Sequence, residues 1–301
     1  MTLPNIPQPG TGPVVFEEGA GSGKSPVLGQ LIAQARAAGK RLTVIDAKQT
    51  EKRTPVAVPY IPDPHNKQLL PLGVDPSNSR PITLDLDLYP HLLIAGGTGS
   101  GVSSTLRLIT AHTVATGGTV DVIDPRRVGL AEFEGVPGVS ITTDPAGFAA
   151  QIEAFHAEMK RRYEQSAKGP RRILAVDDLA TSLMAARSFA SSAVLKRAVQ
   201  LLGKVAFAGR AAGMHLALSG VDRGTLRRMG DAALQDAVTV LLLGRTTRMT
   251  AQHLGVDPQL RRTYPGAAVL KTPGTTGRQI ALSFLTPEQA RIVANRPPIA
   301  D

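Results

Sequence analysis

The sequence has no cysteine and no tryptophan, and aromatic residues make up only 4% of its 301 residues. Without cysteine the chain forms no disulfide and offers no thiolate to a metal. The scarcity of aromatic rings argues against a stacking platform for single-stranded nucleic acid, which needs exposed rings. The six histidines are scattered, and none falls in an H-E-x-x-H pattern that would indicate a zinc site.

Long hydrophobic runs are also missing. No stretch of about 18 apolar residues occurs, so we expect that the chain does not cross a membrane by itself. The first residues, MTLPNIPQPGTGP, lack the apolar core of a signal peptide. These absences lead us to expect a cytoplasmic protein.

The positive charge is unevenly distributed. Residues 1–150 carry 12 Lys and Arg against 13 Asp and Glu, whereas residues 151–301 carry 22 against 11, so the formal net charge of +10 arises in the second half. Such an excess is typical of a surface that binds a polyanion. It is equally typical of a soluble basic protein from an arginine-rich proteome, and charge alone leaves both interpretations open.

Short apolar runs alternate with longer amphipathic ones, which predicts an α/β fold with a mostly parallel sheet and crossover helices. Strands are expected at Val14–Phe16, Leu42–Ile45, Leu92–Ala95, Val120–Ile123, Ile173–Val176, His215–Ser219, Val238–Leu243, Ala267–Leu270 and Gln279–Phe284. Helices are expected at 25–38, 103–116, 146–167, 193–212 and 286–294. The segment 53–81 is rich in Pro and Asn and predicts a linker followed by a hairpin with LLPLGVD and PITLDLD as its strands.

The stretch AGGTGSGVSS, residues 95–104, has the form of a phosphate-binding loop, G-x-x-x-x-G-K-[ST], with one departure. Val102 stands where the lysine is expected. In such a loop, backbone N–H groups and the N-terminus of the following helix hold the phosphates. The candidate nucleotide-binding residues are Gly96, Gly97, Thr98, Gly99, Ser100, Gly101, Val102, Ser103 and Ser104.

The missing lysine affects binding and chemistry differently. One charged hydrogen bond is lost, worth roughly 1.5–3 kcal/mol. Removing a comparable contact from a transition state costs about 10²–10³ in rate. Because the backbone amides and Ser103 remain, we expect nucleotide binding to persist while efficient hydrolysis by this loop alone does not.

A related loop lies 78 residues earlier in the chain. Aligned without gaps, residues 19–46 and 97–124 are identical at 12 of 28 positions, and both run from glycine loop through helix and strand to an aspartate. We interpret them as two copies of a P-loop βαβ unit. The earlier copy has Glu18 where the first glycine belongs, but it keeps the candidate nucleotide-binding and catalytic residues Gly21, Gly23, Lys24 and Ser25.

Three roles remain open for Lys24. It would bind a nucleotide in its own loop, or reach a phosphate held by the later loop in the same chain or the next subunit. Alternatively, the earlier copy is a structural relic.

The segment RRILAVDDLATSL places two carboxylates, Asp177 and Asp178, directly after a buried apolar strand. Ligands bind at this carboxyl-terminal edge in open α/β sheets. In a nucleotide site Asp177 and Ser103 would hold Mg²⁺, and Asp178 would orient the attacking water. The alternative is a strand end at which an aspartate caps the next helix.

Taken in order and spacing, five segments resemble the FtsK/SpoIIIE family of ring-forming DNA-pumping ATPases. They are YPHLLIAGGTGSG (89–101), VIDPRRVGLAEFEGVPG (122–138), AEMKRRYE (157–164), ILAVDDLA (173–180) and GRAAGMHLALS (209–219). The resemblance covers about residues 69–290 and implies a RecA-like P-loop NTPase fold, with ATP and Mg²⁺ as cofactors. It also implies a homo- or hetero-oligomeric ring that acts on double-stranded DNA without sequence preference. We therefore expect an N-terminal βαβ unit with its linker at 1–66 and an ATPase domain at 67–301.

The departures from the family's pattern fall on catalytic positions. Besides Val102, the family's Asp-Glu pair after the acidic strand is Asp177-Asp178 here, and its γ-phosphate-sensing Gln is Gly220. The residues that define the fold remain, whereas those that define the chemistry are altered. This combination indicates a degenerate site.

Basic residues follow one of the predicted strands. In this family the strand that ends at Ser219 leads to a loop facing the ring's channel, where Arg223, Arg227 and Arg228 would contact DNA phosphates. A solvated basic turn is the alternative. Arg210 either faces a neighbouring subunit's nucleotide or is structural, and the histidines at 91 and 215 are expected to pack beside strands.

Three functions remain open from the sequence. The first is a DNA translocase ATPase acting in plasmid, phage or chromosome DNA transfer. The second is a catalytically degenerate, nucleotide-binding or structural subunit of a motor ring. The third is a subunit of a secretion-type ATPase, and the basic second half favours DNA over this one.

Overall fold

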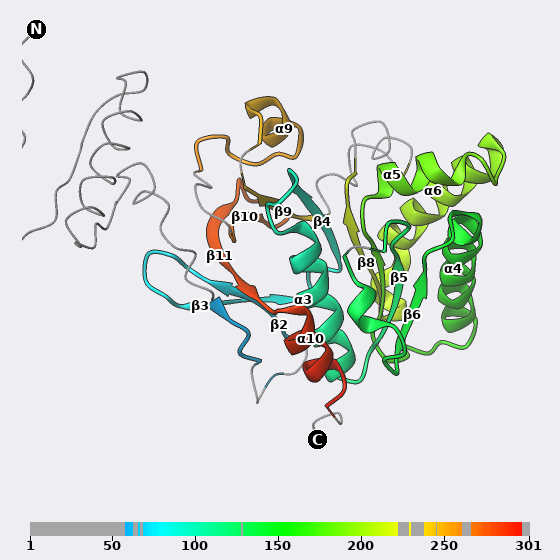
Figure 1. Cartoon of the computed structure of the whole chain (residues 1–301), viewed down its shortest axis with the longest axis horizontal. Coiled ribbons are helices and arrows are strands. Elements are labelled where there is room, and N and C mark those ends of the chain that lie inside the picture. The colour runs from blue at the N-terminus through cyan, green and yellow to red at the C-terminus, as the bar shows by residue number, and fades with distance from the viewer. Residues whose placement is uncertain are drawn as a thin grey trace, which may run out of the picture. The chain divides into compact units, whose positions relative to one another are not determined.

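The computed structural model divides the chain into two compact units, Met1–Val56 and Ala57–Asp301. It describes residues 58–62, 66, 69–127, 129–221, 229, 238–244, 246–260 and 266–296, all of which belong to the second unit (Figure 1). The earlier loop copy, together with the strands and the helix expected around it, lies outside the described residues. The linker residues Val58–Pro59, assigned to the N-terminal unit by the sequence, form strand β1 beside β11 in the second unit.

A single sheet of 11 strands forms the centre of this unit, in the order β3-β2-β11-β10-β9-β4-β8-β7-β5-β6, with β1 paired to β11. The strands are β1 Val58–Pro59, β2 Leu69–Val74, β3 Pro81–Asp85, β4 His91–Gly96, β5 Thr119–Ile123, β6 Val139–Thr142, β7 Arg172–Val176, β8 Met214–Ser219, β9 Thr239–Leu243, β10 Ala267–Lys271 and β11 Arg278–Phe284. From β9 to β6 all neighbours run parallel. In contrast, β10, β11, β2 and β3 pair antiparallel, so one half of the sheet is parallel and carries the carboxyl-terminal edge on which a site is expected.

The central strands read as continuous apolar runs because helices cover both faces of the sheet. Successive side chains of a strand point to opposite faces. In β4, Leu92 and Ile94 accordingly join one hydrophobic cluster, whereas Leu93 joins the other. The strand β7 divides its residues between the same two clusters.

Helices α3 (Val102–Ala115) and α10 (Pro287–Ala294) pack on one face of the sheet, and α4 (Phe148–Glu164), α5 (Leu179–Ala186) and α6 (Ser192–Ala208) pack on the other (Figure 1). The helix α3 is buried at every position from Thr105 to Val114. The sheet and α10 cover this helix, including polar residues such as Arg107 and His112. This burial fixes the N-terminus of α3 at the carboxyl end of β4.

Within the described residues, the α/β architecture expected from the sequence is confirmed, including the antiparallel hairpin of β2 and β3. The sequence missed β6, α5 and the short helix α9 (Arg248–His253). Each has at most eight residues, too few to show a clear hydrophobic period. Among the described residues, no helix is long and apolar enough to cross a membrane.

Candidate functional site

Four neighbouring parallel strands end at the same edge of the sheet, and each contributes to one site. β4 runs into the loop that leads to α3, β5 ends before Asp124, β7 ends before Asp177, and β8 ends at Ser219. The pairings of β4 with β8, β8 with β7 and β7 with β5 are all parallel, so these ends lie side by side. The loop and the acidic strand end expected to form one site are thus brought together.

The glycine loop takes a backbone conformation that only glycine adopts readily. Gly99 has φ 76° and Gly101 has φ 103°, both in the left-handed region. A Cβ on Gly96 would lie 2.3 Å from the Ser100 Oγ, whereas one on Gly97 would meet nothing within 4 Å. The glycines therefore serve both a tight turn and an open outer surface on which a ligand's phosphates would lie against the backbone.

The N-terminus of α3 is open. Its N-cap Gly101 offers no side-chain hydrogen bond, and no acidic residue lies in the first turn. By contrast, side chains cap α5, α6, α9 and α10. An uncapped helix N-terminus leaves N–H groups and a partial positive charge available to an anion. Val102 does not substitute for the missing lysine, because its side chain packs against the hydrophobic cluster beneath α3.

Asp177 lies at the centre of the site. The Ser103 hydroxyl donates to its Oδ2 at 3.1 Å, and the Ser219 hydroxyl donates to its Oδ1 at 3.1 Å. One carboxylate thereby joins the first turn of α3 to the ends of β7 and β8. The side chain is 2% exposed. A buried carboxylate beside a hydroxyl supplies the oxygen ligands that Mg²⁺ prefers, so the donor set fits the metal.

The segment after β5 closes over this contact. A Cβ on Gly129 would lie 2.4 Å from the Asp177 Oδ2, so only glycine fits at that point. The N–H of Gly129 donates to the Asp124 Oδ2 at 2.9 Å. From α3, Arg107 donates to the Gly129 carbonyl at 3.2 Å and forms an ion pair with Glu132. These contacts hold the segment in place above the Ser103–Asp177 pair.

Burial raises the pKa of Asp177, and the nearby Asp124 carboxylate raises it further, while hydrogen bonds from Ser219 and Ser103 act in the opposite direction. The Asp124 side chain is itself buried, and its Oδ1 has no hydrogen-bond partner among the described residues. Two acidic groups are thus crowded at one edge, where the ion pair of Asp177 is with the half-exposed Arg126. A bound cation would relieve this crowding.

Arg126 is the basic residue that reaches this edge. Its guanidinium lies 3.7 Å from the Asp177 Oδ2 and 3.5 Å from the Asp178 Oδ2. The side chain remains 47% exposed, so these ion pairs are loose and contribute little to stability. The neighbouring Arg127 turns away and donates to the Thr143 hydroxyl at 3.0 Å.

Asp178 takes the alternative role left open by the sequence. Its Oδ1 accepts the Thr181 N–H at 3.1 Å and its Oδ2 accepts the Thr181 hydroxyl at 2.7 Å, which caps α5. The backbone at Asp178 is left-handed, with φ 63°. A Cβ on Gly220 would lie 2.4 Å from the Asp178 Oδ1. Both oxygens of Asp178 therefore accept hydrogen bonds. Because a Cβ would clash with this carboxylate, position 220 requires glycine.

The remaining sequence candidates lie elsewhere. Arg210 is exposed in the turn that precedes β8, at the opposite edge of the sheet from the glycine loop. His91 lies in β4 and His215 in β8, and both are buried; burial lowers the pKa of His91 to about 3 and that of His215 to about 4. The earlier-loop residues Gly21, Gly23, Lys24 and Ser25 and the basic residues Arg223, Arg227 and Arg228 lie outside the described residues.

The sequence did not single out Asp124, Arg126 or Gly129 as part of the site. The signal was present in VIDPRRVG, because an aspartate and two arginines follow a predicted parallel strand directly. Carboxyl ends of neighbouring parallel strands share one edge, so this segment had to lie near Asp177.

The family model of the FtsK/SpoIIIE family matches residues 56–169. The chain is 26% identical over 228 residues to the DNA translocase FtsK of Lactiplantibacillus plantarum, a match that covers 65% of this chain and 27% of that protein. It is 32% identical over 184 residues to the DNA translocase FtsK of Staphylococcus aureus, covering 50% of this chain and 22% of that protein. The resemblance drawn from the motifs is confirmed. The chain spans about a quarter of the length of these relatives.

Two solved structures share the fold. The pCW3 conjugation coupling protein TcpA, in its monomer form with ATPγS, superposes with a TM-score of 0.67 at 18% identity, covering 89% of this chain and 85% of that one. The cytoplasmic domain of the type VII secretion ATPase EccC from Thermomonospora curvata gives a TM-score of 0.58 at 19% identity, covering 76% of this chain and 28% of that one. The expected RecA-like P-loop fold is confirmed.

The environment of Asp177 makes a prediction for stability. In the protein without nucleotide or metal, Asp177→Asn is expected to raise the melting temperature by a few degrees at neutral pH, because it removes a buried negative charge while keeping the shape. Since the folded-state pKa is raised, the cost of the charge is complete above that pKa and shrinks as the pH falls toward the ordinary aspartate pKa of about 4, below which the gain should vanish. Thermal unfolding of both proteins from pH 3 to 8 measures this.

Glu164→Gln, which removes an exposed carboxylate at the end of α4, is the control and should leave the melting temperature nearly unchanged. A lower melting temperature for Asp177→Asn at neutral pH would contradict the assignment of a strained, metal-ready carboxylate.

Proposed function

We propose that this chain is a nucleotide-binding motor domain of the FtsK/SpoIIIE type that acts on double-stranded DNA, in translocation or transfer. The observation that carries the proposal is the Ser103–Asp177 contact at the open N-terminus of α3. It combines an anion-binding backbone with the oxygen ligands of a metal. Because the chain matches only part of its relatives' length, their activity and partners extend to it only as this proposal.

In this proposal the phosphates of ATP bind along residues 96–104, and Ser103 and Asp177 hold Mg²⁺. A bound Mg²⁺ would offset the negative charge of the phosphates and of the carboxylate. Ser103 would turn its hydroxyl from Asp177 toward the metal, and the segment around Gly129 would exclude water from the contact. Asp178 is assigned to positioning α5, since both of its oxygens are already engaged there.

The missing lysine leaves the site short of one cation. Arg126 is an arginine whose guanidinium already approaches the same Asp177 oxygen that Ser103 contacts. Its partial exposure leaves it able to turn toward a bound phosphate. We assign Arg126 the phosphate contact that Val102 does not make. Lys24 is the second source of a cation, from its own loop or from a neighbouring subunit, and Lys24→Ala would leave binding and turnover unchanged if the earlier copy is a structural relic.

The role assigned to Arg126 leads to a prediction for nucleotide affinity. Arg126→Ala is expected to weaken ATP binding about 10- to 100-fold, the equivalent of one charged hydrogen bond of roughly 1.5–3 kcal/mol. Binding of AMP, which lacks the outer phosphates, should change little. Adding Val102→Lys to Arg126→Ala should restore much of the loss, because it returns a cation to the loop. Titration calorimetry with each nucleotide measures these affinities.

The matched control is Arg127→Ala, which removes an arginine from the adjacent position that points away from the site. Equal ATP affinity for wild type and Arg126→Ala would remove the assignment of Arg126 and leave the site itself in place. Absence of ATP binding by the wild type would contradict the proposed function.

Double-stranded DNA is the proposed substrate, contacted without sequence preference by Arg223, Arg227 and Arg228 in the segment after β8. We further propose a ring of identical or related subunits around the DNA. The supporting observations are the family match and the basic second half of the chain.

The proposed DNA contact leads to a prediction for duplex binding. Changing Arg223, Arg227 and Arg228 together to Ala should weaken duplex binding several-fold. It should also reduce the steepness of its salt dependence, because each lost phosphate contact removes about 0.9 from the slope of log K against log salt. Fluorescence anisotropy of a labelled duplex at several salt concentrations measures both. An unchanged slope would remove these residues from the DNA contact.

A catalytically degenerate subunit is the second candidate, and it is favoured by a specific observation. Asp178 caps a helix, and Gly220 leaves no side chain to sense a γ-phosphate. Nucleotide binding without turnover, with or without duplex DNA, would select this candidate. The likeness to the secretion ATPase EccC is a likeness of fold alone, and a secretion role would require binding of a peptide signal and indifference to DNA.

A further inference from the structure

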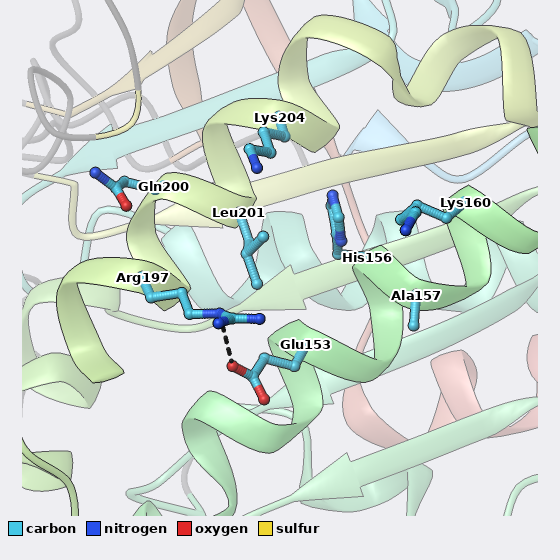
Figure 2. A pocket seen from close by; sticks show the side chains of 8 residues that line it. All are labelled: Glu153, His156, Ala157, Lys160, Arg197, Gln200, Leu201 and Lys204. Carbon is cyan, nitrogen blue, oxygen red and sulfur yellow. Dashed lines mark ion pairs between the residues drawn. The ribbon is translucent and has the colours of Figure 1, made fainter. Parts of the chain in front are cut away.

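A groove of about 870 Å³ lies between α4 and α6, on the opposite face of the sheet from α3 (Figure 2). Its lining in the described part of the chain comes from these two helices: Glu153, His156, Ala157, Lys160, Arg197, Gln200, Leu201 and Lys204. None of these residues belongs to the nucleotide site or to the segment after β8. The groove is therefore a separate feature of the molecule.

The lining residues form two matched stripes. On α4 they occupy positions 153, 156, 157 and 160, and on α6 positions 197, 200, 201 and 204, the same i, i+3, i+4, i+7 spacing in both. This spacing places each stripe along one side of its helix. The buried Leu201 forms the floor, and Figure 2 shows the longer polar side chains around the space between the helices.

The charges on the two stripes are predominantly positive. Arg197 and Glu153 form an ion pair across the groove at 3.3 Å, which neutralises one cation. Lys160 and Lys204 are exposed, and within the described part of the chain neither side chain has an ion pair or hydrogen bond. Two cations therefore face the groove without an ion-pair partner.

His156 lies among the cations of the groove. Burial is the largest cause that lowers the pKa of His156, and Lys204, Lys160 and Arg197 lower it further because they repel its protonated form. Among the described residues of the lining, Lys160, Arg197 and Lys204 outnumber the one acidic residue, Glu153. This excess of positive charge favours an anion in the groove.

We propose that the groove between α4 and α6 binds the sugar–phosphate backbone of duplex DNA, with Lys160 and Lys204 contacting phosphates. The inference rests on the proposed function for the identity of the polyanion, and it adds a DNA contact outside the segment after β8. Along α6 the lining runs from Arg197 to Lys204, seven positions or about 10 Å. Duplex DNA presents one negative charge per about 1.7 Å of axis, so several phosphates face this length.

The composition of the groove favours a nucleic-acid backbone over other anions. Pockets for small molecules are lined mainly by apolar side chains, whereas here only Ala157 and Leu201 are apolar. An acidic peptide helix would need several apolar anchors, which this lining does not offer. Lysines on flexible stems and a neutral Gln200 suit phosphates contacted without base recognition.

The test compares duplex binding by the whole chain and by two double variants of equal charge. Lys160→Ala with Lys204→Ala removes the unpaired cations of the groove. Arg187→Ala with Lys196→Ala removes two exposed cations outside it and is the control. The groove variant is expected to bind a labelled duplex several-fold more weakly, with the salt slope reduced by about 1.8, whereas the control keeps the wild-type slope to within a few tenths. Circular dichroism checks that both variants are folded.

Other outcomes overturn the inference in distinguishable ways. A groove variant that matches the wild type in affinity and slope overturns the groove assignment, while the proposed DNA function stands. If the groove variant binds polyglutamate more weakly than the wild type but binds duplex DNA equally well, the inference is overturned in favour of an acidic protein partner. A wild type that binds no duplex overturns both this inference and the DNA part of the proposed function.

Discussion

The buried carboxylate of Asp177 is the interaction on which the rest of the site depends. It receives hydroxyl hydrogen bonds from the first turn of α3 and from the end of β8, so three elements far apart in the sequence are fixed around two oxygen atoms. Its burial requires glycine at position 129, because any side chain there would enter the contact. The open N-terminus of α3 is held at this carboxylate by the burial of the helix on all sides.

The departures from the family's motifs are linked by geometry. Asp178 turns into a left-handed conformation to cap α5, and that cap occupies the space beside Gly220 in which a longer side chain would stand. Val102 gains packing against the core where a lysine would instead place a charge. A single substitution such as Val102→Lys would therefore return a cation to the loop without restoring the whole of the family's site, and Arg126 offers a cation from a different strand end.

Much of this arrangement could be predicted from the sequence, because the strands and the glycine loop follow regular patterns of residue types along the chain. Apolar runs predict the parallel strands, and the glycine spacing with VDDL after a strand places loop and carboxylate at one edge. The role of Asp178 could not be decided, since cap and catalytic carboxylate have the same local sequence. The groove between α4 and α6 was missed because its residues are ordinary surface residues in each helix, and only their packing brings Lys160 and Lys204 to one space.

The central claim is that the Ser103–Asp177 edge is the site where nucleotide and metal act. The most direct measurement is steady-state ATP hydrolysis by the whole chain, with and without Mg²⁺ and duplex DNA, for wild type and Asp177→Asn. The account predicts Mg²⁺-dependent turnover that duplex DNA stimulates and that falls at least about 100-fold in Asp177→Asn. Turnover of equal rate in both proteins would contradict it.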